Sequence, residues 1–494
     1  MRPPFDAVMR AAGIGLVGGV TGAAANLVVA VLVGRSAGTD GAGRFFTAVA
    51  IFLILANVLE LGADTALVRF VAAALALDRP GQVRALLRVG IVPVGVVGLG
   101  VVAATWALAG LLPGPGRAWW TTLAAAALGL ALLAVVLGAL RSLRGAGAVT
   151  VVQTSGLPVL RLTFLGVGVA AGLVSGPSDW ATAVLLWAAP VGVALAVAVV
   201  LVLRSLRALP PTVPGDVVDG VAFWRFSGAR GVAAALEICL EWADVLVVGV
   251  LCSPAQAGIY AVVTRAARSA ELVQHATRIA LGPALAGALA RRDHDLAVDL
   301  HHRTAGVTAV VTWPFFTVAA WFAPGLLSIF GDGFADGAAA LRVLCVGMAL
   351  AYAAGGVQTL LLMSGLGRDQ VVIKLACLVV NVTGNLALVP VLGIVGAAIA
   401  WSSTLVLDAL LARWRVQAEL GVSLDLLAPV LRGAAAAGAT AALCGVLALG
   451  LHCVGPTSRL LAPALAATAV AVVLGWSAGQ RRRRERAIST TRPR

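Results

Sequence analysis

The sequence LVGRSAGTDGAGRFFTA runs from Leu32 to Ala48, and a similar sequence, VVGVLCSPAQAGIYAVV, runs from Val247 to Val263 at an offset of 215 residues. The matched pairs are Gly34 with Gly249, Ala42 with Ala257, Gly43 with Gly258, and Phe45 with Tyr260. In each copy we predict that a helix ends, a short turn follows, and a new helix opens with a glycine and an aromatic residue. The offset corresponds to about six helices, and an even number of membrane crossings leaves both copies in the same orientation.

The apolar residues around these copies fall in long runs separated by short charged stretches. Hydrophobic residues make up 60% of the 494 residues and charged residues only 12%, which excludes a soluble globular protein. Each run has roughly 20 residues, enough for one helix to cross about 30 Å of hydrocarbon, and the runs do not alternate as barrel strands do. We predict helices at 11–34, 44–72, 87–112, 118–141, 150–173, 181–203, 222–251, 256–288, 304–328, 337–364, 370–389, 391–412, 429–451 and 459–478.

These segments predict an all-α polytopic membrane protein with about fourteen transmembrane helices. We expect a first six-helix lobe at 1–210, a second at 211–418, two further helices at 419–480 and a basic tail at 481–494. The two lobes would be related by a pseudo-two-fold repeat.

The basic residues are distributed unevenly between the two sides of the predicted bundle. One side holds only Arg35, Arg44, Arg117 and Arg459, whereas all the other basic loops and the tail lie on the opposite side. The positive-inside rule therefore predicts that both termini are cytoplasmic, and the predicted helices leave only short loops on the outward side. The net charge of +14 reflects this asymmetry and not a nucleic-acid surface. Arginine supplies every basic residue except Lys374, which suggests a GC-rich bacterial genome and hence a bacterial plasma membrane.

The loops offer little chemistry for an enzyme. The sequence has no phosphate-binding loop of the form GxxxxGK[ST], and its six cysteines form no metal-ligand or disulfide pattern. His294, His301 and His302 fall in a predicted basic inner loop with Asp293, Asp295 and Asp299, where we favour a solvated loop over a metal site. A polyprenyl-dependent glycosyltransferase or ligase is therefore disfavoured, and we expect no cofactor.

The chain resembles the polysaccharide flippase branch of the multidrug, oligosaccharidyl-lipid and polysaccharide exporter superfamily. The resemblance rests on SPAQAGIYAVVTRAARSAEL from Ser253 to Leu272 and on LELGADTALVRFVAA from Leu59 to Ala73, and the predicted topology extends it over essentially the full chain. It implies two lobes around a central cavity that opens alternately to either side. The implied substrate is a lipid-linked glycan, of the undecaprenyl-pyrophosphate type, and glycan polymerase or ligase machinery would be the implied protein partner.

Charged residues within the predicted helices are expensive in lipid, about 2.5–3.5 kcal/mol each at the bilayer centre, so they should face a partner or water. A helical stripe on 222–251 carries Arg230, Glu237, Glu241 and Asp244, and the next predicted helix carries Arg265, Arg268 and Glu271. Two interpretations stay open: a buried network that holds this hairpin together, with Glu241 pairing the arginines, or the lining of a transport cavity.

In the cavity interpretation, arginines bind pyrophosphate and crowded acids exchange a proton or sodium ion. The candidate substrate-binding residues are Arg230, Arg265, Arg268, Arg161 and Arg342, and the candidate ion-coupling residues are Glu237, Glu241, Asp244, Glu60, Asp64 and Glu271. Glu60 and Asp64 are expected one turn apart on the second helix. Arg161, Arg278, Arg342 and Asp408 are single charges for which cavity lining and structural pairing stay open.

Several arginines in a cavity favour an anionic substrate over a cationic drug. A cation-coupled multidrug or metabolite exporter and a peptidoglycan-precursor flippase stay open as alternatives within the same superfamily.

Overall fold

The computed structural model describes residues 5–112, 114–210 and 218–451, and within these ranges it contains helices and no strand. The chain divides into two compact units. The first comprises Met1–Ala261 with Phe330–Asp332, and the second comprises Val262–Ile329 with Gly333–Arg494. The all-α fold class is thus confirmed. The lobe boundary at residue 210 stays a prediction.

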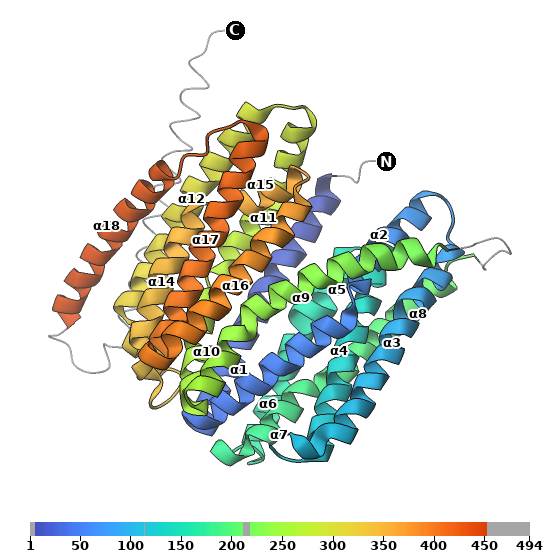
Figure 1. Ribbon diagram of the computed structural model, residues 1–494, viewed down its shortest axis with the longest axis horizontal. Helices are drawn as coiled ribbons and strands as arrows, with labels where there is room; N and C mark the ends of the chain where they lie inside the picture. The colour runs from blue at the N-terminus through green and yellow to red at the C-terminus, as the bar shows by residue number, and fades with distance from the viewer. Residues whose placement is uncertain (1–4, 113, 211–217, 452–494) are drawn as a thin grey trace, which may run out of the picture. The chain divides into compact units, whose positions relative to one another are not determined.

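The first unit is built around α4. Its elements are α1 (Phe5–Glu60), α2 (Ala63–Ala76), α3 (Gln82–Leu108), η1 (Ala109–Leu111), α4 (Arg117–Arg144), α5 (Ala146–Val149), the π-helical η2 (Thr150–Gly156), α6 (Leu157–Ala170), η3 (Pro177–Asp179), α7 (Trp180–Ala188), α8 (Pro190–Arg207), α9 (Gly220–Leu251) and the first half of α10 (Pro254–Arg268). Helix α4 contacts α1, α2, α3 and α8, and α9 runs alongside α1 (Figure 1). An apolar helix contacted on all sides in this way forms the core of its unit.

The second unit contains the remaining helices. They are the rest of α10, α11 (Glu271–Ala290), α12 (His294–Trp321), α13 (Ala323–Ser328), η4 (Phe334–Gly337), α14 (Ala338–Ala353), α15 (Val357–Met363), α16 (Gly367–Leu392), α17 (Ile394–Leu420) and α18 (Leu427–Leu451). Helices α16 and α17 form a close hairpin around Gly393, whose φ of 57° permits the tight reversal (Figure 1). Helix α17 also packs on α14 and α15, so these four helices meet along α17.

Ten helical stretches of the described residues are long and apolar enough to cross a membrane. Thirteen of the fourteen predicted segments fall on helices, and the last, 459–478, lies outside the described residues. Ten is fewer than the thirteen predicted segments because α1 and α2 form one continuous stretch. In addition, α9, α10 and α11 are not both long and apolar enough to be counted. The total of fourteen stays a prediction.

Several helix boundaries differ from those expected, and three of them bear on the candidate site. The predicted turn between residues 34 and 44 is a break at one residue, Gly38, with a φ of 67°. The predicted helix 44–72 is broken at Leu61 and Gly62, and the predicted helix 256–288 is broken between Arg268 and Glu271. Long apolar runs predict crossings, but a break of one or two residues leaves the hydrophobic pattern unchanged.

The two copies of the repeat contact each other within the first unit. A Cβ atom on Gly43 would collide with the carbonyl oxygen of Pro254, and one on Gly258 would collide with the carbonyl oxygen of Thr39 and the backbone of Gly43. Gly43 thus lies within α1, and its missing side chain permits the close approach of the two backbones.

Candidate functional site

The four charges of the predicted stripe all lie on α9, which runs unbroken from Gly220 to Leu251. Arg230 Nη2 lies 4.0 Å from Glu237 Oε2, and both side chains are 42% exposed. Glu241 is half-buried, and Asp244 is buried and accepts a 2.6 Å hydrogen bond from the Tyr260 hydroxyl. The stripe thus runs from an exposed ion pair to a buried carboxylate, and its roles in transport stay predictions.

The charges that follow it lie on either side of the α10–α11 break. Arg268 Nε donates to Glu271 Oε1 over 2.9 Å, with side chains 25% and 43% exposed. Arg265 lies one turn earlier on α10 and is half-buried. Arg268 therefore has a carboxylate partner from the first turn of α11. The predicted pairing of Glu241 with these arginines stays a prediction.

Glu60 and Asp64 do not share one helix, and this expectation was wrong. Glu60 ends α1 and Asp64 lies in the first turn of α2, with Leu61 and Gly62 between them at φ values of 52° and 72°. Ser227 Oγ on α9 donates to the Leu61 carbonyl over 2.8 Å, so α9 supplies a hydrogen bond at the break. Both carboxylates are half-buried at this junction.

Arg161 is the most deeply buried of the candidate arginines. It lies on α6, just after the π-helical segment η2, and is 8% exposed. Its guanidinium carbon lies 3.6 Å from the ring centroid of Trp187, which makes edge contacts with Phe45 and Phe52 of α1. A desolvated cation stacked on tryptophan gains about 2 kcal/mol, and here the aromatic cluster fixes the plane of the guanidinium.

Two nitrogens of this guanidinium, Nε and Nη2, are buried without a hydrogen-bond partner. They form one edge of the group, where two parallel N–H bonds point to one side. Buried polar groups normally find partners, and an arginine remains charged. The Nε and Nη2 groups of Arg161 are therefore fixed in position and available as hydrogen-bond donors to an oxyanion.

Arg342 lies on α14 and is exposed, with Nε donating to the Ala320 carbonyl over 3.2 Å. It borders two apolar hollows of about 620 and 690 Å³, one towards α12 and α18 and the other towards α17. The side chain of Arg278 lies outside the described parts of the chain.

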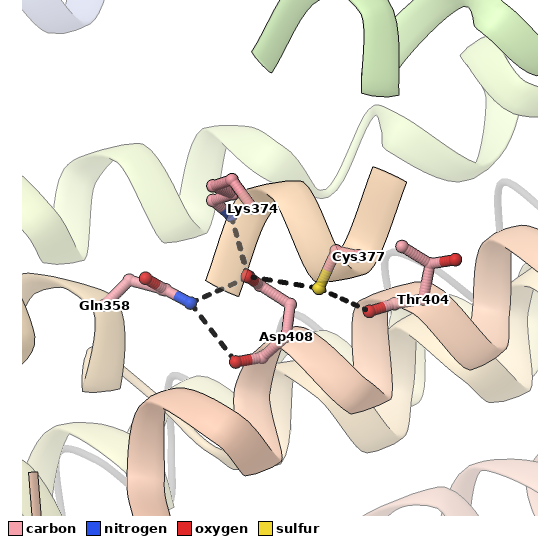
Figure 2. A network of polar contacts seen from close by, with 5 residues as sticks. All are labelled: Gln358, Lys374, Cys377, Thr404 and Asp408. Carbon is pink, nitrogen blue, oxygen red and sulfur yellow. Dashed lines mark hydrogen bonds and ion pairs between the residues drawn. The ribbon is translucent and has the colours of Figure 1, made fainter. Parts of the chain in front are cut away.

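Asp408 of α17 is the centre of a polar network that the sequence did not single out. Lys374 Nζ lies 2.9 Å from both carboxylate oxygens, and the side chains of Lys374 and Asp408 are 21% and 15% exposed. Gln358 Nε2 donates to Oδ2 over 2.8 Å, and Cys377 Sγ lies 3.9 Å from Oδ1 (Figure 2). Structural pairing is thus the observed state of Asp408.

Lys374 falls within the predicted helix 370–389. The structure places it two turns inside α16, a helix that is apolar and long enough to cross a membrane. The available signal was that it is the one lysine among 36 basic residues. Polar side chains continue this network along α16 and α17: Asn381 Nδ2 lies 3.4 Å from Thr404 Oγ1, and Asn385 Nδ2 donates to the Asn381 carbonyl over 2.9 Å.

The histidines do not lie in an inner loop, so that prediction was wrong. Helix α12 begins at His294, where Asp293 caps it by accepting from the Leu296 amide, and His301 is buried. His302 Nε2 accepts a 2.9 Å hydrogen bond from the Asp425 amide. Among the described residues, no group of three or more histidine, cysteine or acidic side chains could hold a metal ion.

No family model and no curated protein matches the chain. Solved structures do. The lipid II flippase MurJ in an inward closed conformation superposes with a TM-score of 0.71 at 10% identity, covering 93% of this chain and 97% of that one. An inward-facing multidrug resistance MATE family transporter of the MOP superfamily gives 0.62 at 15% identity, covering 83% and 98%. The chain has the fold of a MOP-superfamily transporter.

A MOP-superfamily transporter from Pyrococcus furiosus, described by the reversed polarity of its binding pocket, also gives a TM-score of 0.62, at 16% identity, with coverage of 84% and 95%. The match in fold extends over most of the length of all these proteins. It confirms the predicted all-α polytopic fold, and the neighbours named here are described as a flippase and as transporters.

Proposed function

We propose that the protein is a flippase that moves a lipid-linked oligosaccharide or polysaccharide precursor across the plasma membrane by alternating access, for the synthesis of cell-surface polysaccharide. The observation that supports an anionic substrate is that Nε and Nη2 of Arg161 lack hydrogen-bond partners in a protein with a MOP-superfamily fold. A phosphate or pyrophosphate offers the paired oxygens that this edge binds. The MurJ neighbour acts on lipid II, which is itself a lipid-linked substrate and supports this class of amphiphile.

In this proposal both termini are cytoplasmic, and the two six-helix lobes alternate access to the substrate. Arg230, Arg265, Arg268 and Arg342 are further candidates for contacting the substrate, and the acids on α9 are candidates for coupling to an ion. The same arrangement serves a peptidoglycan precursor, which differs in its glycan and not in its phosphate chemistry.

A cation-coupled exporter is the second candidate function, because MATE family transporters share the fold. The buried cation argues against it. An unpaired arginine repels a cationic drug, whereas it gains charge-assisted hydrogen bonds from an oxyanion.

The test is a flipping assay in liposomes loaded with a fluorescent polyprenyl-pyrophosphate glycan, scored as the fraction that becomes accessible outside. We expect wild-type protein to flip the lipid and Arg161→Ala to lose tenfold or more of the rate, because a charge-assisted hydrogen bond contributes about 1.5–3 kcal/mol. Arg117→Ala is the matched control: Arg117 also stacks on a tryptophan, Trp106, at 4.9 Å, but it is exposed.

Equal flipping by Arg161→Ala and Arg117→Ala, at equal Tm, would remove Arg161 from the substrate site. No flipping by the wild type, together with uptake of small solutes driven by a proton or sodium gradient, would favour the exporter. Arg265→Ala and Arg268→Ala, measured in the same assay, test the two arginines of α10.

A further inference from the structure

The Asp408 network has the composition of a site for a small hard cation. The Asp408 carboxylate and the Asp408 backbone carbonyl both accept hydrogen bonds from Gln358 Nε2, and the Thr404 carbonyl one turn earlier accepts from Cys377 Sγ. Carboxylate and carbonyl oxygens are ligands that alkali and alkaline-earth ions prefer. The Gln358 Oε1 atom is buried without a hydrogen-bond partner, which leaves one more oxygen unused beside the network.

In this network, the single negative charge of Asp408 is balanced by one positive charge. Asp408 is the carboxylate at its centre, and Lys374 brings a single ammonium to within 2.9 Å of both of its oxygens (Figure 2). A divalent ion would leave surplus charge in a poorly solvated part of a membrane-spanning helix pair, which is unfavourable. The neutral state is therefore one carboxylate with one monovalent cation.

The identity of the cation is informative. Every other basic residue of the chain is arginine, and lysine stands only at position 374. A guanidinium is planar and binds oxygens along its edges, whereas an ammonium is a compact point charge that several oxygens can surround. Lysine is thus the basic side chain that resembles a small metal ion.

Stability alone does not explain the pair. A buried ion pair is frequently no better than apolar residues of the same volume, because both charges lose their hydration. Lys374 and Asp408 lie well inside α16 and α17, and Gln358 brings in α15, so the charge joins three helices at one point.

We propose that the oxygens around Asp408 form a monovalent-cation site and that the tethered ammonium of Lys374 is its resident cation. The protein then holds α15, α16 and α17 together here without a metal ion from solution. Shortening Lys374 vacates the position of the ammonium and opens the site to sodium. This inference concerns binding and stability, so it stands apart from the proposed flippase activity.

The test is thermal unfolding of purified protein in detergent, in sodium chloride and in choline chloride at equal ionic strength. The wild type is expected to have the same Tm in both salts. Lys374→Ala is expected to have a lower Tm in choline and a saturable rise of a few degrees in sodium, because a ligand that binds the folded state stabilises it by mass action.

Two matched variants isolate the vacated site. Lys374→Met fills the space of the lysine chain without a charge, and Lys374→Ala combined with Asp408→Asn empties the space but removes the carboxylate. Both are expected to have the same Tm in sodium and choline. A sodium response equal to that of Lys374→Ala in either variant would overturn the proposal.

Three further results would also overturn it. One is a folded Lys374→Ala protein with the same Tm in the two salts. Another is a Lys374→Ala protein that gel filtration finds unfolded in both salts while the double variant folds. The third is saturable binding of radioactive sodium to the wild type that Asp408→Asn abolishes, because the site would then hold sodium with the lysine present.

Discussion

Arg161 and Lys374 are both basic residues inside apolar helices, one in each compact unit, and their surroundings are opposite. Lys374 lies 2.9 Å from both oxygens of a carboxylate, whereas Arg161 stacks on Trp187 and leaves two buried nitrogens without partners. The charge of Lys374 is completed by the protein itself. The charge of Arg161 has no hydrogen-bond partner on two of its nitrogens, and in the proposed function that edge binds an oxyanion.

The largest expected effect is the loss of the carboxylate beside Lys374. Asp408→Ala should destabilise the protein by up to about 3–5 kcal/mol, because it leaves a half-buried ammonium inside the helix pair without its counter-charge. Chemical unfolding in detergent measures this loss. The control is Lys374→Met combined with Asp408→Leu, which removes both charges and should recover most of the stability. Equal losses in the single and double variants would show that packing, and not charge, holds the pair.

Arg161→Met should have a much smaller effect on stability. The substitution loses the stacking energy of about 2 kcal/mol but also removes an unsatisfied cation whose burial costs a similar amount, so we expect a change of no more than about 1 kcal/mol. The same unfolding experiment measures it. A loss as large as that of Asp408→Ala would mean that Arg161 has a counter-charge within the protein, and the contrast between the two units would disappear.

The smallest effect is expected for a third basic residue, Arg230. Its partner Glu237 is 4.0 Å away and both side chains are 42% exposed, so Arg230→Ala should reduce stability by no more than about 0.5 kcal/mol. The variant measures how much an exposed ion pair contributes to the free energy of unfolding of this protein. A loss of stability comparable to that of Asp408→Ala would show that the exposure of a basic side chain does not predict how much its ion pair contributes to stability.

The two copies of the repeat differ in a similar way. In the second copy, Tyr260 donates a 2.6 Å hydrogen bond to the buried Asp244. In the first copy, the residues 215 positions earlier are Phe45 and Val29, and both are buried. The hydroxyl and the carboxylate are thus present together or absent together. This pairing is expected because a buried polar group that loses its partner costs about 1–3 kcal/mol.

Much of the architecture could be predicted from the amino-acid sequence. The apolar runs identify the helices, and the spacing of Arg230, Glu237, Glu241 and Asp244 predicts one charged stripe, which the unbroken α9 carries. The matched glycines predict equivalent helix junctions. Each of these features has a period or a length that the bilayer imposes, so it is readable without knowledge of tertiary contacts.

The positions of helix breaks could not be predicted in this way. Gly62 adopts a positive φ where α9 approaches, and a Cβ atom there would collide with the backbone of Ser227 and Gly231. These contacts join residues more than 160 positions apart in the sequence, as the hydrogen bond from Ser227 to Leu61 illustrates. A pattern of neighbouring residues in the sequence does not indicate which distant segment will pack against them.

The sequence by itself determined that this protein is a bundle of membrane-spanning helices with charges placed inside it, because the length and polarity of each segment decide whether it can lie in lipid. Only the tertiary structure decided which of those charges are satisfied. Lys374 and Asp408 are 34 residues apart on different helices, and Arg161 and Trp187 are 26 apart. Whether such residues meet depends on how each helix is rotated about its axis, and that rotation is set by the packing of its neighbours.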